Sequence, residues 1–172
     1  MIQTKIVQGN LLYHAAHGLC RVKQLTRQIE AGKEVLFYAL EPSSANKTKV
    51  RFIIPAVNVQ ASGFHSLVST MEAKGILKYL GDGNSAPLAE GSEYEASYLA
   101  KEIFSFSRVD RTVKDLKNRR RMERSVHGLV GELAVVLKMT LNETVRIIRK
   151  NLGDASKINP LVMSALDHAV EN

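Results

Sequence analysis

Short apolar runs separated by turn residues occupy roughly the first 60 positions of the chain, a pattern that predicts β-strands. Residues 19–26 alternate, with Cys20 and Val22 opposed to Arg21 and Lys23, as in a strand with one buried face. Further strands are expected at residues 11–13, 34–40 and 49–54. Short strands at this spacing suggest a small antiparallel barrel.

A hairpin turn is predicted at residues 30–33, because Gly32 adopts a positive φ at little cost. After Gly63 the apolar positions recur every three or four residues, which indicates helices. Ser69 with Glu72 has the spacing of a capping box, in which side chains close the first turn of a helix. The segment 140–143, Thr-Leu-Asn-Glu, repeats this signal.

The remaining helix signals lie in the second half of the chain. Gly81 is predicted to end the first helix. A second helix is expected from about residue 93, continuing through Val109 and Val113 to Leu116. Asn159-Pro160 is predicted to open the last helix, since proline suits its first position. The strongest apolar stripe comprises Val126, Leu129, Val130, Leu133, Val136 and Leu137.

Length and composition narrow the class of protein. The 172 residues suit one domain or two small ones, and 45% of them are hydrophobic, enough for a core. We find no apolar run long enough for a membrane span and expect no signal peptide or membrane partner. The single cysteine suits a reducing cytosol, so a cytoplasmic location is predicted. Lys and Arg number 24 against 17 Asp and Glu, a net charge of +7 that favours polyanionic partners.

The ligand types in His14-x-x-His17-x-x-Cys20 suit zinc. Steps of three residues alternate between the two sides of a strand, so these side chains do not share a face. A fourth ligand would have to come from His65 or a distant carboxylate. We therefore expect no metal site and no cofactor, with His17-Gly18 forming a bend and Cys20 packing as a small apolar residue.

Catalytic signatures are absent from the sequence. No Ser-His-Asp arrangement has a local signature, and Gly81-Asp82-Gly83 follows a helix where a phosphate-binding loop would open one. His127 lies among apolar helix positions and is interpreted as a helix-surface histidine. The chain is therefore predicted not to be an enzyme, with no catalytic residues and no small-molecule substrate.

A basic cluster precedes the strongest apolar stripe. Its members are Arg108, Arg111, Lys114, Lys117, Arg119, Arg120, Arg121 and Arg124. At helical spacing Arg120 and Arg124 share a face, as do Lys117 and Arg121. Because the apolar stripe begins only at Val126, the helical turns that carry the basic cluster are expected to stand free of the core. Their side chains would then suit contact with phosphate groups. The alternative is a solvated charged helix with no ligand.

Several motifs follow one another in a definite order along the chain. Residues 9–22, GNLLYHAAHGLCRV, are followed by a Tyr-x-Leu strand at 38–40, an Ile-Pro strand end at 54–55 and Gly-Phe-His-x-Leu at 63–67. Together they resemble the RNA-polymerase-interacting module of CarD-like bacterial transcription factors. Further along, Leu-Val-Gly-Glu-Leu-Ala at 129–134 resembles the core helix of the family's C-terminal half.

The resemblance implies an α+β fold with two domains. Residues 1–66 would form a small antiparallel β-barrel, Tudor-like, that binds RNA polymerase. Residues 67–172 would form an all-helical domain that binds DNA. The expected function is transcription regulation, with the polymerase β subunit and promoter DNA, without sequence preference, as partners.

The same resemblance implies which residues make these contacts. The expected polymerase-binding residues are Arg27, Lys49, Arg51 and Ile53. The expected DNA-binding residues are Tyr94, Arg119, Arg120 and Arg124. Tyr94 stands near the place where the family has a tryptophan wedge.

Two departures from the family leave an alternative open. The chain has no tryptophan, and the connection from Val113-Lys114-Asp115-Leu116 to the basic helix is nearly reduced to Lys117-Asn118. The alternative is a protein-interaction module that docks on RNA polymerase or another partner without binding DNA.

Overall fold

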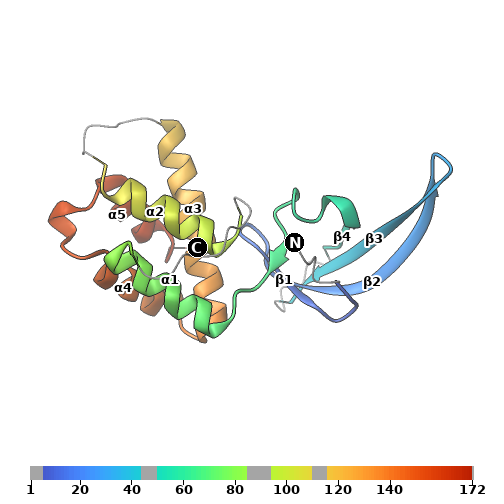
Figure 1. Cartoon of the computed structure of the whole chain (residues 1–172), viewed down its shortest axis with the longest axis horizontal. Helices are drawn as coiled ribbons and strands as arrows, with labels where there is room; N and C mark the ends of the chain where they lie inside the picture. The colour runs from blue at the N-terminus through green and yellow to red at the C-terminus, as the bar shows by residue number, and fades with distance from the viewer. Residues whose placement is uncertain (1–5, 44–49, 85–93, 110–115, 172) are drawn as a thin grey trace. The chain divides into compact units, whose positions relative to one another are not determined.

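Strands and α-helices are segregated along the chain in the computed structural model (Figure 1). The structure describes residues 6–43, 50–84, 94–109 and 116–171. It divides into two compact units, Met1–Leu67 with the strands and Val68–Asn172 with the α-helices. The sequence placed the division between residues 66 and 67. The architecture is α+β, as expected.

In the described residues of the N-terminal unit, five strands form one antiparallel sheet, a half-barrel with the order β4-β3-β2-β1-β5. The strands are β1 Leu11–His14, β2 Gly18–Glu30, β3 Lys33–Pro42, β4 Phe52–Pro55 and β5 His65–Ser66. A short 3₁₀ turn, η1 (Ala56–Asn58), follows β4. The antiparallel pairing is confirmed, and β4 and β5 are the two edges of the sheet.

The alternation predicted for residues 19–26 is confirmed from Cys20 to Lys23 and is interrupted after that, where Lys23 and Gln24 are both exposed. Cys20 and Val22 are fully buried, whereas Arg21 and Lys23 are exposed. The register with β3 shifts between Val22 and Gln24, which marks a β-bulge at this point. The buried side chains make one small core on the inner side of the sheet, with Leu12, Cys20, Val22, Tyr38, Leu40, Val59 and Phe64 as its members.

The turn between β2 and β3 is the two-residue loop that the sequence predicted. Glu30 pairs with Lys33, and the residues between them, Ala31 and Gly32, have φ values of 48° and 76°. Two consecutive positive φ angles are typical of the tight hairpin turn that matches strand twist. The predicted strand at 49–54 begins only at Phe52 in the structure.

Five α-helices form the C-terminal unit within the described residues. They are α1 Thr70–Asp82, α2 Ala96–Ser107, α3 Leu116–Leu137, α4 Leu141–Leu152 and α5 Pro160–His168, with a 3₁₀ turn η2 (Ala155–Lys157) before α5. Both predicted capping boxes are confirmed at α1 and α4. The Asn159 side chain accepts a hydrogen bond from the Leu161 N–H at 2.9 Å, so the predicted opening of α5 is confirmed. No helix in this part of the chain is long and apolar enough to cross a membrane.

Two predicted helix boundaries were wrong. Helix α1 continues through Gly81 to Asp82, and Gly83 caps it in the left-handed conformation with a φ of +68°. A Cβ atom at Gly83 would lie 2.5 Å from the Phe104 ring, so α2 also requires glycine there. Helix α2 begins at Ala96 and stops at Ser107, before Val109; the predicted continuation through Val113 lies outside the described residues.

The core of the C-terminal unit surrounds α3, which contacts each of the other four helices. Leu129 and Leu133 are fully buried on it. Glu132 is buried as well, and its carboxylate accepts a hydrogen bond from the Val68 N–H at 3.0 Å. A buried carboxylate requires such partners, because desolvating an unpaired charge costs much more than burying an apolar group. Glu132 therefore fixes the start of the unit to its central helix.

Replacing Gly83 by alanine should destabilise the C-terminal unit, by about 1–2 kcal/mol for the left-handed backbone alone. The displaced Phe104 ring would add to this loss. Gly75→Ala is the matched control in the same helix, because nothing lies within 4 Å of a Cβ there. Alanine's higher helix propensity should leave that variant equal to wild type or more stable. Chemical denaturation measures both; equal destabilisation of the two variants would contradict this account.

Candidate functional site

Strand β4 presents an edge of the sheet together with exposed side chains. It pairs with β3 on one side and ends the strand order on the other, so no described strand covers its outer edge. Phe52 and Ile54 pack against the core. Ile53, between them, is 63% exposed. An edge strand with an exposed apolar side chain is a template on which another chain's strand can pair.

Arg51 stands directly before β4, and an ion pair with Glu41 holds its guanidinium in place. Its Nη2 and Nε lie 2.7 and 3.1 Å from Oε1 of Glu41 on β3. The Lys23 ammonium lies 3.9 Å from the other oxygen of the same carboxylate. One carboxylate thus faces two cations, and the outer face of the sheet keeps a positive excess beside Ile53.

The four residues expected to bind polymerase are not gathered at one place. Arg51 and Ile53 lie together at β4. Arg27 lies on β2 opposite Leu36, five residues along β3 from Glu41, which is about 17 Å along a strand. It faces Glu34 at 3.5 Å, with both side chains well exposed. Lys49 lies outside the described residues.

An aromatic cluster supports β4 from the core side. The Phe52 ring lies 4.5 Å from the His17 ring and 5.5 Å from the Phe64 ring, measured between centroids. His14 stacks on His17 at 4.5 Å and contacts Phe64 at 4.8 Å. Sequence reasoning treated the two histidines as a bend and a doubtful metal site and missed this cluster. Only their contacts with Phe52 and Phe64, distant in sequence, reveal it.

Burial and the neighbouring His17 lower the pKa of His14 below its ordinary value, in that order of importance, and His65 adds a smaller effect in the same direction. Burial raises the pKa of the Cys20 thiol to about 11, so the thiolate that a metal would need is disfavoured. Within the described ranges, no three His, Cys, Asp or Glu residues lie close enough together to hold a metal ion.

Helix α3 carries the second candidate surface. Lys117, Arg120 and Arg124 are exposed on one face of its N-terminal half, and we call them the α3 row. Within the part of the chain that the structure describes, neither Arg120 nor Arg124 forms an ion pair. Their guanidinium groups are therefore available for a ligand.

Neighbouring arginines of α3 are engaged within the protein. Nε of Arg119 lies 2.9 Å from Oε1 of Glu123, one turn along the helix. Arg121 forms an ion pair with Glu102 of α2, whose carboxylate raises the pKa of Arg121 and also accepts a hydrogen bond from Ser125. Of the three arginines expected to bind DNA, the structure therefore brings together Arg120 and Arg124 and leaves Arg119 in a separate pair.

The expectation that the basic turns of α3 stand free was wrong in part. Met122 and Ser125 are already buried, so the inner face of the helix starts one turn before Val126. The residues of the α3 row are exposed, whereas Arg121 connects α3 to α2 through its ion pair with Glu102. Tyr94, the remaining expected DNA contact, lies in a turn before α2 and is partly exposed.

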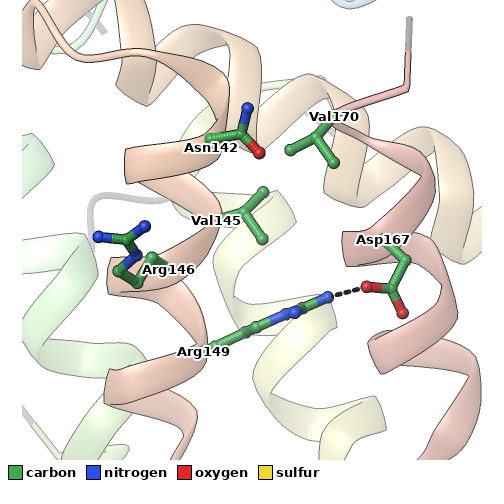
Figure 2. A pocket seen from close by; sticks show the side chains of 6 residues that line it. All are labelled: Asn142, Val145, Arg146, Arg149, Asp167 and Val170. Atoms are coloured by element: carbon green, nitrogen blue, oxygen red, sulfur yellow. Dashed lines mark hydrogen bonds and ion pairs between the residues drawn. The ribbon is translucent and has the colours of Figure 1, made fainter.

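A cavity of about 430 Å³ lies between α4 and the C-terminal end of α5 (Figure 2). Arg149 points across it to Asp167, with which it forms an ion pair, whereas Arg146 points away from Asp167. The lining residues are Asn142, Val145, Arg146, Arg149, Asp167 and Val170. They include no nucleophile beside a base, and Nε of Arg149 is buried without a hydrogen-bond partner among the described residues.

Comparison with known proteins adds no assignment: no protein-family model matches the chain, and no curated protein matches its sequence.

Acid should destabilise the N-terminal unit. An unfolded histidine has a pKa near 6.5, whereas that of folded His14 is lower. Above about pH 6.5 the imidazole is neutral in both states. As pH falls below this value and through the folded pKa, the unfolded state binds the proton first, so stability is lost. Thermal unfolding monitored by NMR signals of β1 and β2 should show this loss, and His14→Phe should reduce it. An equal pH dependence in that variant would show that other groups cause it.

Proposed function

We propose that this protein is a CarD-like transcription regulator that links RNA polymerase to promoter DNA. In this proposal the N-terminal unit is a Tudor-like domain that binds the polymerase β subunit. The helical unit contacts DNA without reading its sequence. The protein acts in the cytoplasm, is not an enzyme and needs no cofactor.

The observation that carries the proposal is the open edge of β4 with Arg51 and Ile53 beside it. Strand addition would give a partner main-chain hydrogen bonds, and Ile53 would bury its exposed apolar surface. Because Glu41 and the aromatic cluster hold this edge in place, little ordering would accompany binding. The order of the sequence motifs supports RNA polymerase as the partner.

The α3 row supports the DNA contact. Arginines on a rigid helix present a planar fork of donors that suits phosphate oxygens. Phosphate contacts position a protein on DNA without carrying sequence information. With Arg120 and Arg124 unpaired in the described part of the chain, binding would not require a protein ion pair to break first.

A second candidate function is a protein-interaction module that uses only the β4 edge. It is favoured by the internal ion pairs of Arg119 and Arg121, which leave a small basic surface on α3. The absence of tryptophan from the sequence favours it as well.

Ile53→Glu should weaken polymerase binding at least about 10-fold, or about 1.4 kcal/mol, because the new carboxylate would be buried unpaired in the interface. Arg51→Glu should act in the same direction, since it places a second acid beside Glu41. Surface plasmon resonance with immobilised core polymerase measures both affinities.

The matched control is Ile29→Glu, the same change at an exposed position near the tip of the β2–β3 hairpin. It should bind like wild type. If Ile53→Glu and Arg51→Glu also bind like wild type, the docking surface does not include β4.

Arg120→Ala combined with Arg124→Ala should flatten the dependence of duplex binding on salt. Each phosphate contact contributes about 0.9 to the slope of log K against log salt, so the double variant should lose about two units. Fluorescence anisotropy at several salt concentrations, on two unrelated duplexes, measures the slope and should find it the same for both sequences.

Arg119→Ala is the control on the same helix, because it removes an arginine already paired with Glu123. Its slope should stay close to that of wild type. A double variant that keeps the full slope would identify α3 as a solvated charged face and favour the interaction module.

A further inference from the structure

Lys138, directly after the last residue of α3, has an unusual backbone conformation. Its φ is +55°, and apart from Ala31 in the hairpin turn it is the only non-glycine residue with positive φ among the described residues. The left-handed conformation brings Cβ too close to the carbonyl oxygen that follows, so glycine is the usual residue at this point of a helix end.

The hydrogen bonds at this helix end are those of a glycine-closed helix. The Met139 N–H donates to the Ala134 carbonyl at 3.0 Å, and the Lys138 N–H donates to the Val135 carbonyl at 3.4 Å. This pair of bonds defines the motif in which the left-handed position is most often glycine. Lysine there costs stability, and its side chain is exposed, so packing does not explain it. Strain of this kind is often retained where the side chain has a use.

The position of Lys138 indicates that use. Arg124, Gly131 and Val135 follow Arg120 at spacings of four, seven and four residues, which keeps these four on one face of α3, and Lys138 comes three residues later, directly after the helix end. Each is exposed or partly exposed, and none is acidic. Lys138 therefore adds a cation at the C-terminal end of α3, whereas Arg120 and Arg124 lie in its N-terminal half.

The two basic ends of this face are widely separated. From Arg124 to Lys138 the chain advances fourteen residues, about 21 Å at 1.5 Å per residue. The DNA major groove is about 12 Å wide, and long basic side chains can reach over its borders. Gly131 has no side chain, and Val135 between the two ends is small and 40% exposed, so neither would hold the helix away from the groove.

We propose that α3 lies across a groove of duplex DNA, with Lys138 on the phosphates of one strand and Arg120 and Arg124 on those of the other. This inference rests on the proposed DNA contact and adds Lys138 as a binding residue. Retaining lysine at a glycine position then exchanges some folding stability for a phosphate contact.

Lys138→Gly in the full chain separates the two roles, because it should change stability and binding in opposite directions. Relief of the left-handed strain should raise the melting temperature by about 2–4 °C. Loss of one phosphate contact should lower the salt slope on a duplex by about one unit and the affinity roughly fivefold at 0.15 M salt. Lys138→Arg should keep the wild-type slope.

Lys157→Gly is the control for net charge, since it removes an exposed lysine from η2. It should leave the slope unchanged. If Lys138→Gly keeps the wild-type slope while the Arg120 and Arg124 double variant loses it, this inference is wrong and the proposed function stands. If Lys138→Gly lowers the melting temperature, lysine stabilises the helix end and the inference is again wrong. If the wild-type protein shows no salt-dependent binding, the proposed DNA contact fails, and this inference fails with it.

Discussion

The helical unit depends on α3, a helix of 22 residues. Its inner face must fill the core of the unit, and its outer face carries cations in solvent. Filling the space among four other helices requires buried residues such as Leu129 and Leu133. The buried carboxylate of Glu132 also binds the first backbone N–H of the unit. Because packing against four helices holds the inner face of α3 in place, its outer face has a fixed position in solvent. Cations on that face are therefore fixed in spacing before any ligand arrives, which reduces the entropy lost on binding.

Much of the fold could be predicted from the sequence, because the signals that set it are local. Alternation along β2, the positive φ at Gly32 and the two capping boxes each involve residues within four positions of one another. The end of α1 could not be predicted in this way. Gly81 and Gly83 are equivalent by propensity, and the Phe104 ring, on another helix, makes Gly83 the necessary glycine. Contacts between elements decide between local signals of equal strength.

For the candidate surfaces, the sequence predicts which types of residue are present but not which of their side chains remain available to a ligand. The sequence shows that arginines crowd one segment, and the Arg119–Glu123 pair follows from its spacing of four. It does not show that Glu102 of α2 reaches Arg121, because their approach depends on how the two helices pack. The same limit applies to β4: its position at the edge of the sheet follows from strand order, which alternation alone does not give. Tertiary packing therefore selects the available side chains from a larger set of candidates.

The central claim is that one chain uses two separate surfaces for two partners, the β4 edge for polymerase and the outer face of α3 for DNA. Photo-crosslinking in a complex of the protein, RNA polymerase and promoter DNA tests it most directly. A crosslinking residue at position 53 should attach to the polymerase β subunit, and one at position 124 should attach to DNA. Attachment of position 124 to protein alone, or failure of position 53 to reach the polymerase, would contradict the claim.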